Sequence, residues 1–208
     1  MEPSESSFFV VGNTGTEIFV DAQNIKSAYA NQRALLCHKA IAPELLNQLA
    51  NAAAKARFAS DSVEHLGHRW IESPSVIGAA IQLVLNRPEM LEWFKTVTGC
   101  TASGGIEGRL VETRPGGVDH LSWHRDTAPN TRYEFGITLH LRPCQYDGGA
   151  FEMRDSTSKH PLFRHYPADP GDLLIFEVDH RSEHRVMPVV SGEPRLVFTG
   201  WFIADVTN

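Results

Sequence analysis

The stretch GDLLIFEVDHRSEHRVMPVVSGEPRLVFTGWF covers residues 171–202 and sets the expected fold. Its apolar runs are short, rich in Leu, Ile, Val and Phe, and separated by polar or glycine-containing turns, which is typical of β-strands. It predicts one strand, a loop, a second strand that starts at His184, a turn, and a final strand that contains Arg195. An arginine inside an apolar strand is costly unless an anion meets its charge, so Arg195 is a candidate binding residue.

Similar short strands are predicted through the whole second half of the chain. From residue 105 onward, apolar segments alternate with the turn sequences PGG, PN, YDGG and DPGD, all of which favour chain reversal. The predicted strands are GRLVETR, DHLSWHRD, EFGITLHLR, GAFEMRD, LLIFEV, HRVMPVV and RLVFTGWFI. This number and spacing of strands indicates a sandwich or a jelly roll.

The first half has the helical pattern instead. Helices are predicted over residues 42–58, 73–88 and 88–99, with prolines suited to the first turns, Ser73 as an N-cap and a glycine at the last C-terminus. One further strand is expected at 34–41. We therefore expect a mainly β fold of the α+β class. It would be a single domain in which residues 1–104 give helical support and residues 105–203 form the jelly-roll core.

Composition restricts the classes of function. The chain has 208 residues and a formal net charge of -6, which argues against a broad nucleic-acid-binding surface because such surfaces depend on clustered Lys and Arg. Cys37, Cys100 and Cys144 are odd in number and far apart, as expected of reduced thiols. No secretory leader and no apolar run of about 18 residues is found. A cytoplasmic protein without membrane association is expected.

The sequence SWHRD at 122–126 predicts two metal ligands on one strand face. Side chains alternate along a strand, so His124 and Asp126 point to the same side. Together with His184 they would supply two imidazoles and one carboxylate, which is the facial triad of non-haem iron sites that leave other metal positions open. His-x-Asp alone arises often by chance, so the prediction depends on the third ligand and on Arg195.

These residues, taken in order, resemble the iron(II)- and 2-oxoglutarate-dependent dioxygenase superfamily, and most closely its prolyl-4-hydroxylase-like branch. HRD at 124–126, HRVMPV at 184–189 and Arg195 after a short gap are similar to that family's motifs. YDGGAFEMRD at 146–155 resembles its Gly-Gly strand, PGDLLIF the strand before its distal histidine, and RLVFTGWF its closing strand. The resemblance covers about residues 105–203.

The resemblance implies a double-stranded β-helix in which His124, Asp126 and His184 bind Fe(II) and are the catalytic residues. Arg195 would bind the distal carboxylate of 2-oxoglutarate, and Thr199 would assist from the same strand face. Ascorbate is a candidate reductant. The implied reaction couples decarboxylation of 2-oxoglutarate to succinate and CO2 with hydroxylation of an unactivated carbon. Halogenating relatives carry a small residue at the carboxylate position, so Asp126 favours hydroxylation.

The sequence departs from the family pattern at one place and leaves the substrate open. Prolyl hydroxylases often carry a tyrosine shortly before His-x-Asp, whereas VETRPGGVDHLSWH contains none, so Thr113, Arg114 or another residue would complete the cosubstrate pocket. The substrate would be a small molecule or a protein side chain, with dioxygen as co-reactant. The oligomeric state is open.

Alternative interpretations remain at this stage. His120 and His180 each lie four residues before a predicted ligand and are weaker candidates for metal binding. A nucleic-acid demethylase of the same superfamily usually carries a second arginine six residues after the first, where this chain has Trp201. A non-catalytic jelly-roll binding module, a degenerate metal-binding relative and a cupin-like isomerase are the other classes, and none of them explains Arg195.

Overall fold

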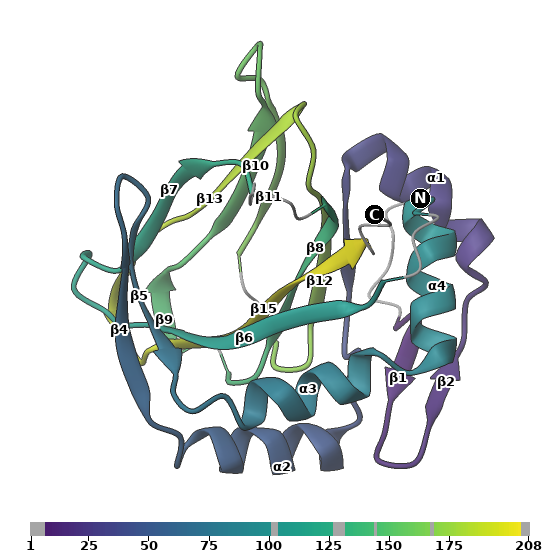
Figure 1. Ribbon diagram of the computed structural model, residues 1–208, viewed down its shortest axis with the longest axis horizontal. Coiled ribbons are helices and arrows are strands. Elements are labelled where there is room, and N and C mark those ends of the chain that lie inside the picture. Colours follow the sequence, from purple (N-terminus) through teal and green to yellow (C-terminus); the bar gives the residue numbers. More distant parts are fainter. Residues whose placement is uncertain (1–6, 101–103, 127–131, 144, 167–168, 205–208) are drawn as a thin grey trace.

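A large, strongly curved antiparallel sheet dominates the computed structural model, which describes residues 7–100, 104–126, 132–143, 145–166 and 169–204. Its strands follow the order β11-β10-β13-β7-β5-β6-β15-β8-β12-β3, and β4 pairs with β5 at the side. The sheet folds back on itself and forms a barrel that is open at its ends (Figure 1). This double-stranded β-helix confirms the predicted fold class.

The strand bounds are close to those expected from the sequence. The strands of the second half are β6 (Ile106–Thr113), β7 (His120–His124), β8 (Arg132–His140), β9 (Tyr146–Gly148), β10 (Phe151–Asp155), β11 (Pro161–His165), β12 (Leu173–Glu177), β13 (Ser182–Val186), β14 (Val189–Gly192) and β15 (Arg195–Ala204). The predicted strand at 184–190 is divided into β13 and β14, because the chain leaves the barrel at Met187 and Pro188 and β14 then pairs with β9.

The first half contributes strands as well as helices. Its strands are β1 (Phe9–Val11), β2 (Thr16–Ile18), β3 (Ala34–Cys37), β4 (Phe58–Val63) and β5 (Gly67–Glu72). β3 extends the sheet beside β12, as its apolar sequence predicted. The β4–β5 hairpin was not predicted, because FASDSV and GHRWIE carry mixed polar side chains that are only partly buried.

β5 joins the two halves of the barrel. It pairs with β6 at Trp70 and Ile71 and with β7 at Gly67 and His68, so it bridges two strands that are consecutive in the sequence but not hydrogen-bonded neighbours. The close approach to β7 requires a glycine: a Cβ on Gly67, whose φ is 146°, would lie 2.0 Å from the His120 carbonyl oxygen. The barrel wall therefore includes a strand from the first half.

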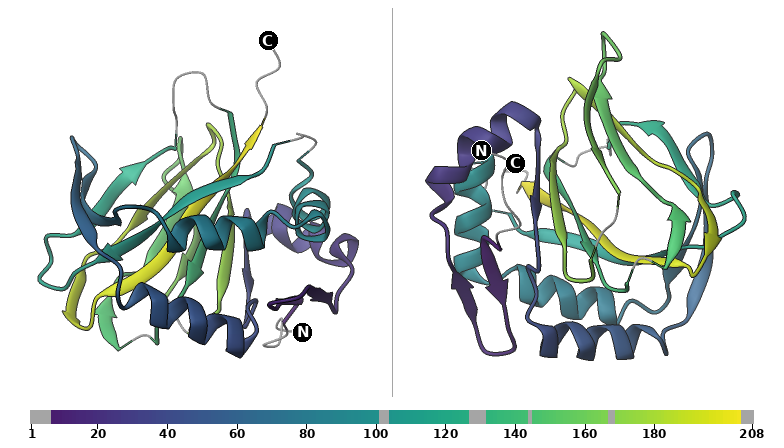
Figure 2. Two further views of the ribbon diagram at one scale, coloured as in Figure 1. Left: turned by 60° about the horizontal axis from the view of Figure 1, so that its bottom comes forward. Right: turned by 180° about the vertical axis from the view of Figure 1, so that it is seen from behind.

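The described part of the chain contains four helices, which lie outside the barrel: α1 (Ala22–Gln32), α2 (Pro43–Ala53), α3 (Ile77–Leu85) and α4 (Pro88–Thr98). α3 packs along β6, α2 lies next to α3, and α1 packs against α4 (Figures 1 and 2). The predicted start of α2 at Pro43 and the end of α4 at Gly99, with φ 76°, are confirmed. Among the described helices, none has both the length and the apolar character that a membrane crossing requires.

Two helix predictions were wrong in detail. α2 ends at Ala53 rather than at residue 58, because β4 begins at Phe58. α3 begins at Ile77, so Ser73 is not its N-cap. Instead, the buried carboxylate of Glu72 accepts hydrogen bonds from the backbone N–H groups of Ile77 (2.8 Å) and Gly78 (2.9 Å), and this satisfies two of the donors that a helix start leaves open.

The main core lies between the helices and the outside of the barrel. Phe94 of α4, Phe135 of β8 and Phe202 of β15 are fully buried there, and the rings of Phe135 and Phe202 stack with centroids 5.1 Å apart. A smaller cluster contains Phe151 and Phe176. Burial of large apolar side chains on one face of β15 and β8 leaves the opposite face, which points into the barrel, available for polar residues.

Candidate metal centre and cavity

Two neighbouring strands bring the predicted metal ligands together. β7 and β13 are antiparallel, and His124 and His184 are direct partners in their register. Their imidazole centroids are 4.3 Å apart. Asp126 follows two residues after His124, just past the end of β7, so its carboxylate returns to the same face. The alternation that the sequence predicted brings His124 and Asp126 to one face, and the register between β7 and β13 adds His184.

The donor atoms have the spacing of a metal site. His124 Nε2 lies 3.5 Å from Asp126 Oδ1, and His184 Nε2 lies 3.3 Å from Asp126 Oδ2. One donor atom from each residue falls within 4.8 Å of the others. The Nδ1–H of His124 donates to the Ser122 carbonyl oxygen at 2.7 Å, which leaves Nε2 with its lone pair directed at the cluster. Two imidazole nitrogens and a carboxylate oxygen fit a first-row metal ion such as Fe(II).

Electrostatics inside the cluster favour a charged carboxylate. Burial opposes the charged form of Asp126, but the two histidines outweigh it and hold the pKa of this carboxyl well below its usual range. Burial likewise opposes the charged form of His124, and the hydrogen bond and negative charge of Asp126 raise its pKa above the ordinary value. The charged carboxylate between the two imidazoles gives the cluster the negative charge that a metal cation would meet.

Trp201 is a further residue of the candidate site, and its contact with Asp126 was not predicted from the sequence. Its indole Nε1–H donates to Asp126 Oδ2 at 2.6 Å. The residue lies on β15 six positions after Arg195, on the same strand face, where only the absence of a second arginine had been noted. A donor behind a ligating carboxylate fixes its orientation and charge distribution. The even spacing from Arg195 was a usable signal, because residues separated by an even number lie on one face of a strand.

His184 is held by aromatic rings. Phe151 of β10 stacks on its imidazole with centroids 5.6 Å apart, and Phe176 of β12 lies at 5.0 Å. Both phenylalanines are buried. These contacts restrict rotation of the imidazole about its side-chain bonds, so the nitrogen that faces Asp126 stays in place without a metal.

The cluster opens into a cavity, which also contains the other predicted binding residues. Arg195 lies on its wall and is 4% exposed, and Thr199 lies four residues further along β15. Thr113 is buried on the same wall and is the register partner of Arg195. Thr138 of β8, the register partner of Thr199, was not predicted and also lines the cavity.

Arg114 takes no part in the cavity wall. Its Nε–H donates to Glu112 Oε1 at 2.7 Å, and its guanidinium lies 3.5 Å from the centre of the Trp70 ring. Of the two residues proposed to replace the family's tyrosine, Thr113 is therefore the one whose hydroxyl faces the cavity.

The two rival histidines lie in different surroundings. His120 lines the cavity, with Nδ1 2.8 Å from the Val118 carbonyl oxygen, but it lies outside the cluster of donor atoms. His180 is exposed and lines a different pocket together with Asp179 and Glu177.

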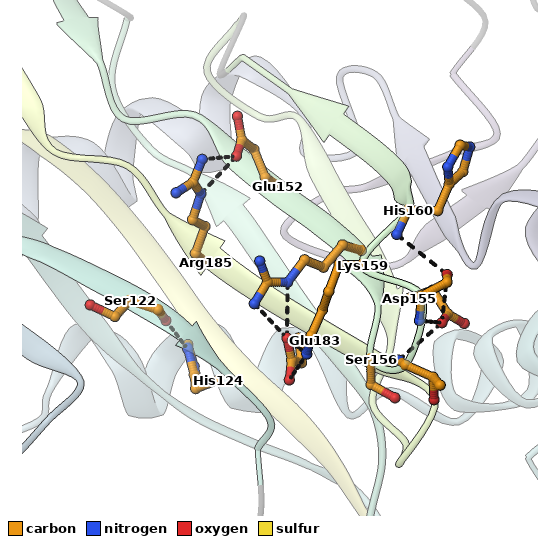
Figure 3. A network of polar contacts seen from close by, with 12 residues as sticks. Ser122, His124, Glu152, Asp155, Ser156, Lys159, His160, Glu183 and Arg185 are labelled. Carbon is orange, nitrogen blue, oxygen red and sulfur yellow. Dashed lines mark hydrogen bonds and ion pairs between the residues drawn. The ribbon is translucent and has the colours of Figure 1, made fainter.

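The outer face of the site-bearing strands carries a network of ion pairs. Arg185 of β13 pairs with Glu152 of β10 at 2.6 Å, and Glu183 pairs with Arg154 at 2.8 Å and with Lys159 at 2.9 Å. Figure 3 shows these contacts beside the hydrogen bond between His124 and Ser122.

Trp123 belongs to this outer face. It points away from the metal ligands and is only partly buried, because its ring lies 4.0 Å from the Arg154 guanidinium and 4.6 Å from that of Arg185. Cation–π contacts therefore replace core packing at this position.

Comparison with known proteins agrees with the geometry. Residues 110–203 match the model of the 2OG-Fe(II) oxygenase superfamily. No match was found among curated proteins. Among solved structures, an oxidoreductase of the 2OG-Fe(II) oxygenase family from Burkholderia pseudomallei is similar with a TM-score of 0.71 and 15% identity, over 88% of this chain and 90% of that one.

Two prolyl hydroxylases are similar as well. A prolyl-4-hydroxylase from Pseudomonas putida has a TM-score of 0.65 and 19% identity, over 87% of this chain and 97% of that one. A prolyl hydroxylase from Trichoplax adhaerens, in complex with a hypoxia inducible factor oxygen degradation domain peptide fragment, has a TM-score of 0.61 and 16% identity, over 88% and 89%. At these identities the likeness concerns the fold.

Proposed function

Because residues 110–203 belong to the 2OG-Fe(II) oxygenase superfamily, we propose that this chain is an Fe(II)- and 2-oxoglutarate-dependent dioxygenase. It would hydroxylate an unactivated carbon of a small molecule or of a protein side chain and release succinate and CO2. The observation that carries the proposal is that one cavity contains both the His124–Asp126–His184 cluster and the buried Arg195. A metal-binding module without a cosubstrate has no use for a buried arginine at that place.

The metal and cosubstrate together would supply the oxidising chemistry, and the protein's part is to bind, orient and shield them. Arg195 is suited to a bidentate pair with the distal carboxylate of 2-oxoglutarate, because a guanidinium presents two parallel N–H donors. Thr113, the register partner of Arg195, and Thr199, four residues further along β15, line the same cavity and could offer hydroxyl groups to the cosubstrate. The Trp201 indole keeps the Asp126 carboxylate oriented toward the two imidazoles.

The structure gives these residues rigid supports. His124 and His184 lie on paired strands rather than on loops. Phe151 and Phe176 pack on His184 from the inside, and the ion pairs of Figure 3 link β10 to β13 on the outside. Sites that are held by two layers of contacts keep their geometry within the narrow limits that catalysis needs.

The test is an anaerobic titration of the apoprotein with Fe(II) and 2-oxoglutarate, which monitors the visible charge-transfer band expected of a chelated 2-oxoglutarate–iron complex. We expect a saturable band that is abolished in His184→Ala. His180→Ala removes an exposed histidine of the same chain segment and serves as the matched control, which keeps the band.

Arg195→Ala separates cosubstrate binding from metal binding. Loss of a hydrogen-bonded charge pair of about 1.5–3 kcal/mol raises the 2-oxoglutarate concentration at half-saturation by roughly tenfold to a hundredfold, while Fe(II) affinity is retained. Absence of the band and of binding of either ligand to the wild-type chain would refute the proposal and favour a non-catalytic binding module. Once binding is established, candidate substrates are screened by succinate release.

A further inference from the structure

Two further arginines, Arg69 and Arg109, lie near the metal centre. Arg69 of β5 lines the same cavity as the metal ligands; its side chain is 13% exposed, and its Nε–H donates to Asp61 Oδ2 at 2.8 Å. Arg109 of β6 is half-buried, and its guanidinium lies 5.4 Å from the centre of the Trp201 ring. Arg109 therefore contacts the residue whose indole holds Asp126.

Arg109 has a positive charge that the described protein groups do not neutralise. It forms no ion pair with any residue that the structure describes, whereas Arg69 is paired with Asp61. Glu107 lines the same pocket as Arg109 but lies beyond ion-pair distance. Burial, and then the nearby charge of Arg69, lower the pKa of Arg109 from its ordinary value, and the carboxylates of Asp61 and Asp126 offset only part of this effect. Two guanidinium groups that are partly removed from water and close to each other favour the entry of an anion between or beside them.

The position of Arg109 connects it to the reaction site. Arg109, Gln82, Tyr133 and Trp201 line a second pocket, and Trp201 also lines the metal cavity. Trp201 is therefore a wall that the metal cavity and the pocket of Arg109 share. The indole and the Tyr133 ring, which stack with centroids 5.3 Å apart, form an apolar part of the second pocket.

The charges of the loaded site support the same conclusion. Those of Fe(II), Asp126, the 2-oxoglutarate dianion and Arg195 cancel, and Asp61 cancels Arg69. Glu107 lines the same pocket as Arg109 without forming an ion pair, so among the described residues beside this centre it is the Arg109 guanidinium that lacks a direct partner. A substrate with one negative group would balance it, and electrostatic complementarity of this kind selects among substrates.

From this geometry we propose that the substrate carries a carboxylate or a similar oxyanion that binds to Arg109, with Arg69 beside it, while the carbon to be oxidised lies in the metal cavity. This inference rests on the proposed function, since it assigns the substrate class of the same site. It makes Arg109 a specificity-determining residue.

The test measures binding without turnover. The protein is loaded with Mn(II) and saturating 2-oxoglutarate under anaerobic conditions, and paramagnetic relaxation of ligand protons is followed by NMR. The probes are straight-chain monocarboxylates from acetate to octanoate and the matching primary amides. Enhanced relaxation of the 2-oxoglutarate protons shows independently that metal and cosubstrate are bound. Its absence would count against the proposed function rather than against the role of Arg109.

We expect at least one carboxylate to show saturable enhancement that its amide lacks, with an affinity reduced by about tenfold or more in Arg109→Gln. Arg109→Lys keeps the charge and retains most of the binding, which provides a readout if the glutamine variant loses 2-oxoglutarate. Arg57→Gln, at an exposed arginine away from both pockets, is the matched control and leaves the affinity unchanged.

Three results would overturn the assignment. The first is that no carboxylate is enhanced more than its amide. The second is that the enhancement disappears as 2-oxoglutarate is raised, because the probe then occupies the cosubstrate site. The third is equal affinity in the wild-type chain and in Arg109→Gln.

Discussion

Replacing Trp201 by phenylalanine isolates the contribution of one hydrogen bond to metal binding. The change removes the indole N–H that donates to Asp126 Oδ2 at 2.6 Å. It keeps an aromatic ring beside Tyr133 and beneath the Arg109 guanidinium. The carboxylate is buried and charged, so the lost donor is not simply replaced by bulk water.

The expected magnitude follows from the charge on the acceptor. A hydrogen bond to a charged group is worth about 1.5–3 kcal/mol, which corresponds to roughly tenfold to a hundredfold in a binding constant. Loss of partners behind metal ligands typically lowers metal affinity by a similar factor. We therefore expect the apoprotein of Trp201→Phe to bind Fe(II) or Co(II) weaker by roughly tenfold to a hundredfold.

The assay is an anaerobic calorimetric titration of apoprotein with metal, with Trp123→Phe as the matched control. Trp123 is the neighbour of His124 on β7, but its ring lies on the outer face between Arg154 and Arg185. Its replacement lowers the free energy of unfolding by about 1 kcal/mol through weaker cation–π contacts and leaves metal affinity unchanged. Wild-type affinity in Trp201→Phe, or an equal loss in both variants, would contradict the role assigned to the indole.

Three further outcomes are expected. Burial lowers the pKa of His165 to about 4, so folding favours its neutral form, and stability is lost as the pH falls from about 6.5 toward 4 at about 1.4 kcal/mol per pH unit. In urea unfolding, the stability that the chain loses between pH 7 and pH 5 should be smaller by about 2 kcal/mol in His165→Phe than in the wild type. An equal loss in both proteins would show that this histidine titrates normally. Glu72→Ala removes the acceptor for two N–H groups at the start of α3, and this should lower the free energy of unfolding by about 2 kcal/mol. A decrease of less than about 0.5 kcal/mol would mean that water replaces the carboxylate as the acceptor. Zn(II) at a hundred times its dissociation constant should stabilise the chain by about 2.7 kcal/mol, and a similar gain in His184→Ala would place the metal elsewhere.

Local pattern was sufficient to predict most strands of the fold and two of the three candidate ligands. The alternation in SWHRD places His124 and Asp126 on one face, and this holds in any strand regardless of its neighbours. The apolar runs and turn sequences identified most strands of the barrel. The position of His184 opposite His124 could not be worked out from spacing, since it depends on the register between β7 and β13; it was expected from the family resemblance.

The features that could not be predicted from the sequence depend on contacts between distant segments of the chain. Trp201 and Asp126 are 75 positions apart, and no local pattern links them. The strands β4 and β5 contain polar side chains such as His68 and Arg69, which lie at the cavity and therefore break the apolar alternation by which strands are recognised. Glu72 replaces Ser73 as the cap of α3 because the helix begins four residues later than the sequence suggested.

The position of β5 between β6 and β7 has a consequence for the design of truncated fragments of this protein. A fragment restricted to the family-matched residues 110–203 would lack this strand, and the backbone groups of β6 and β7 that it now pairs would become two open sheet edges. Exposed edges of this kind recruit strands from other molecules. Such a fragment should therefore self-associate on expression, even though it would retain all three candidate iron ligands.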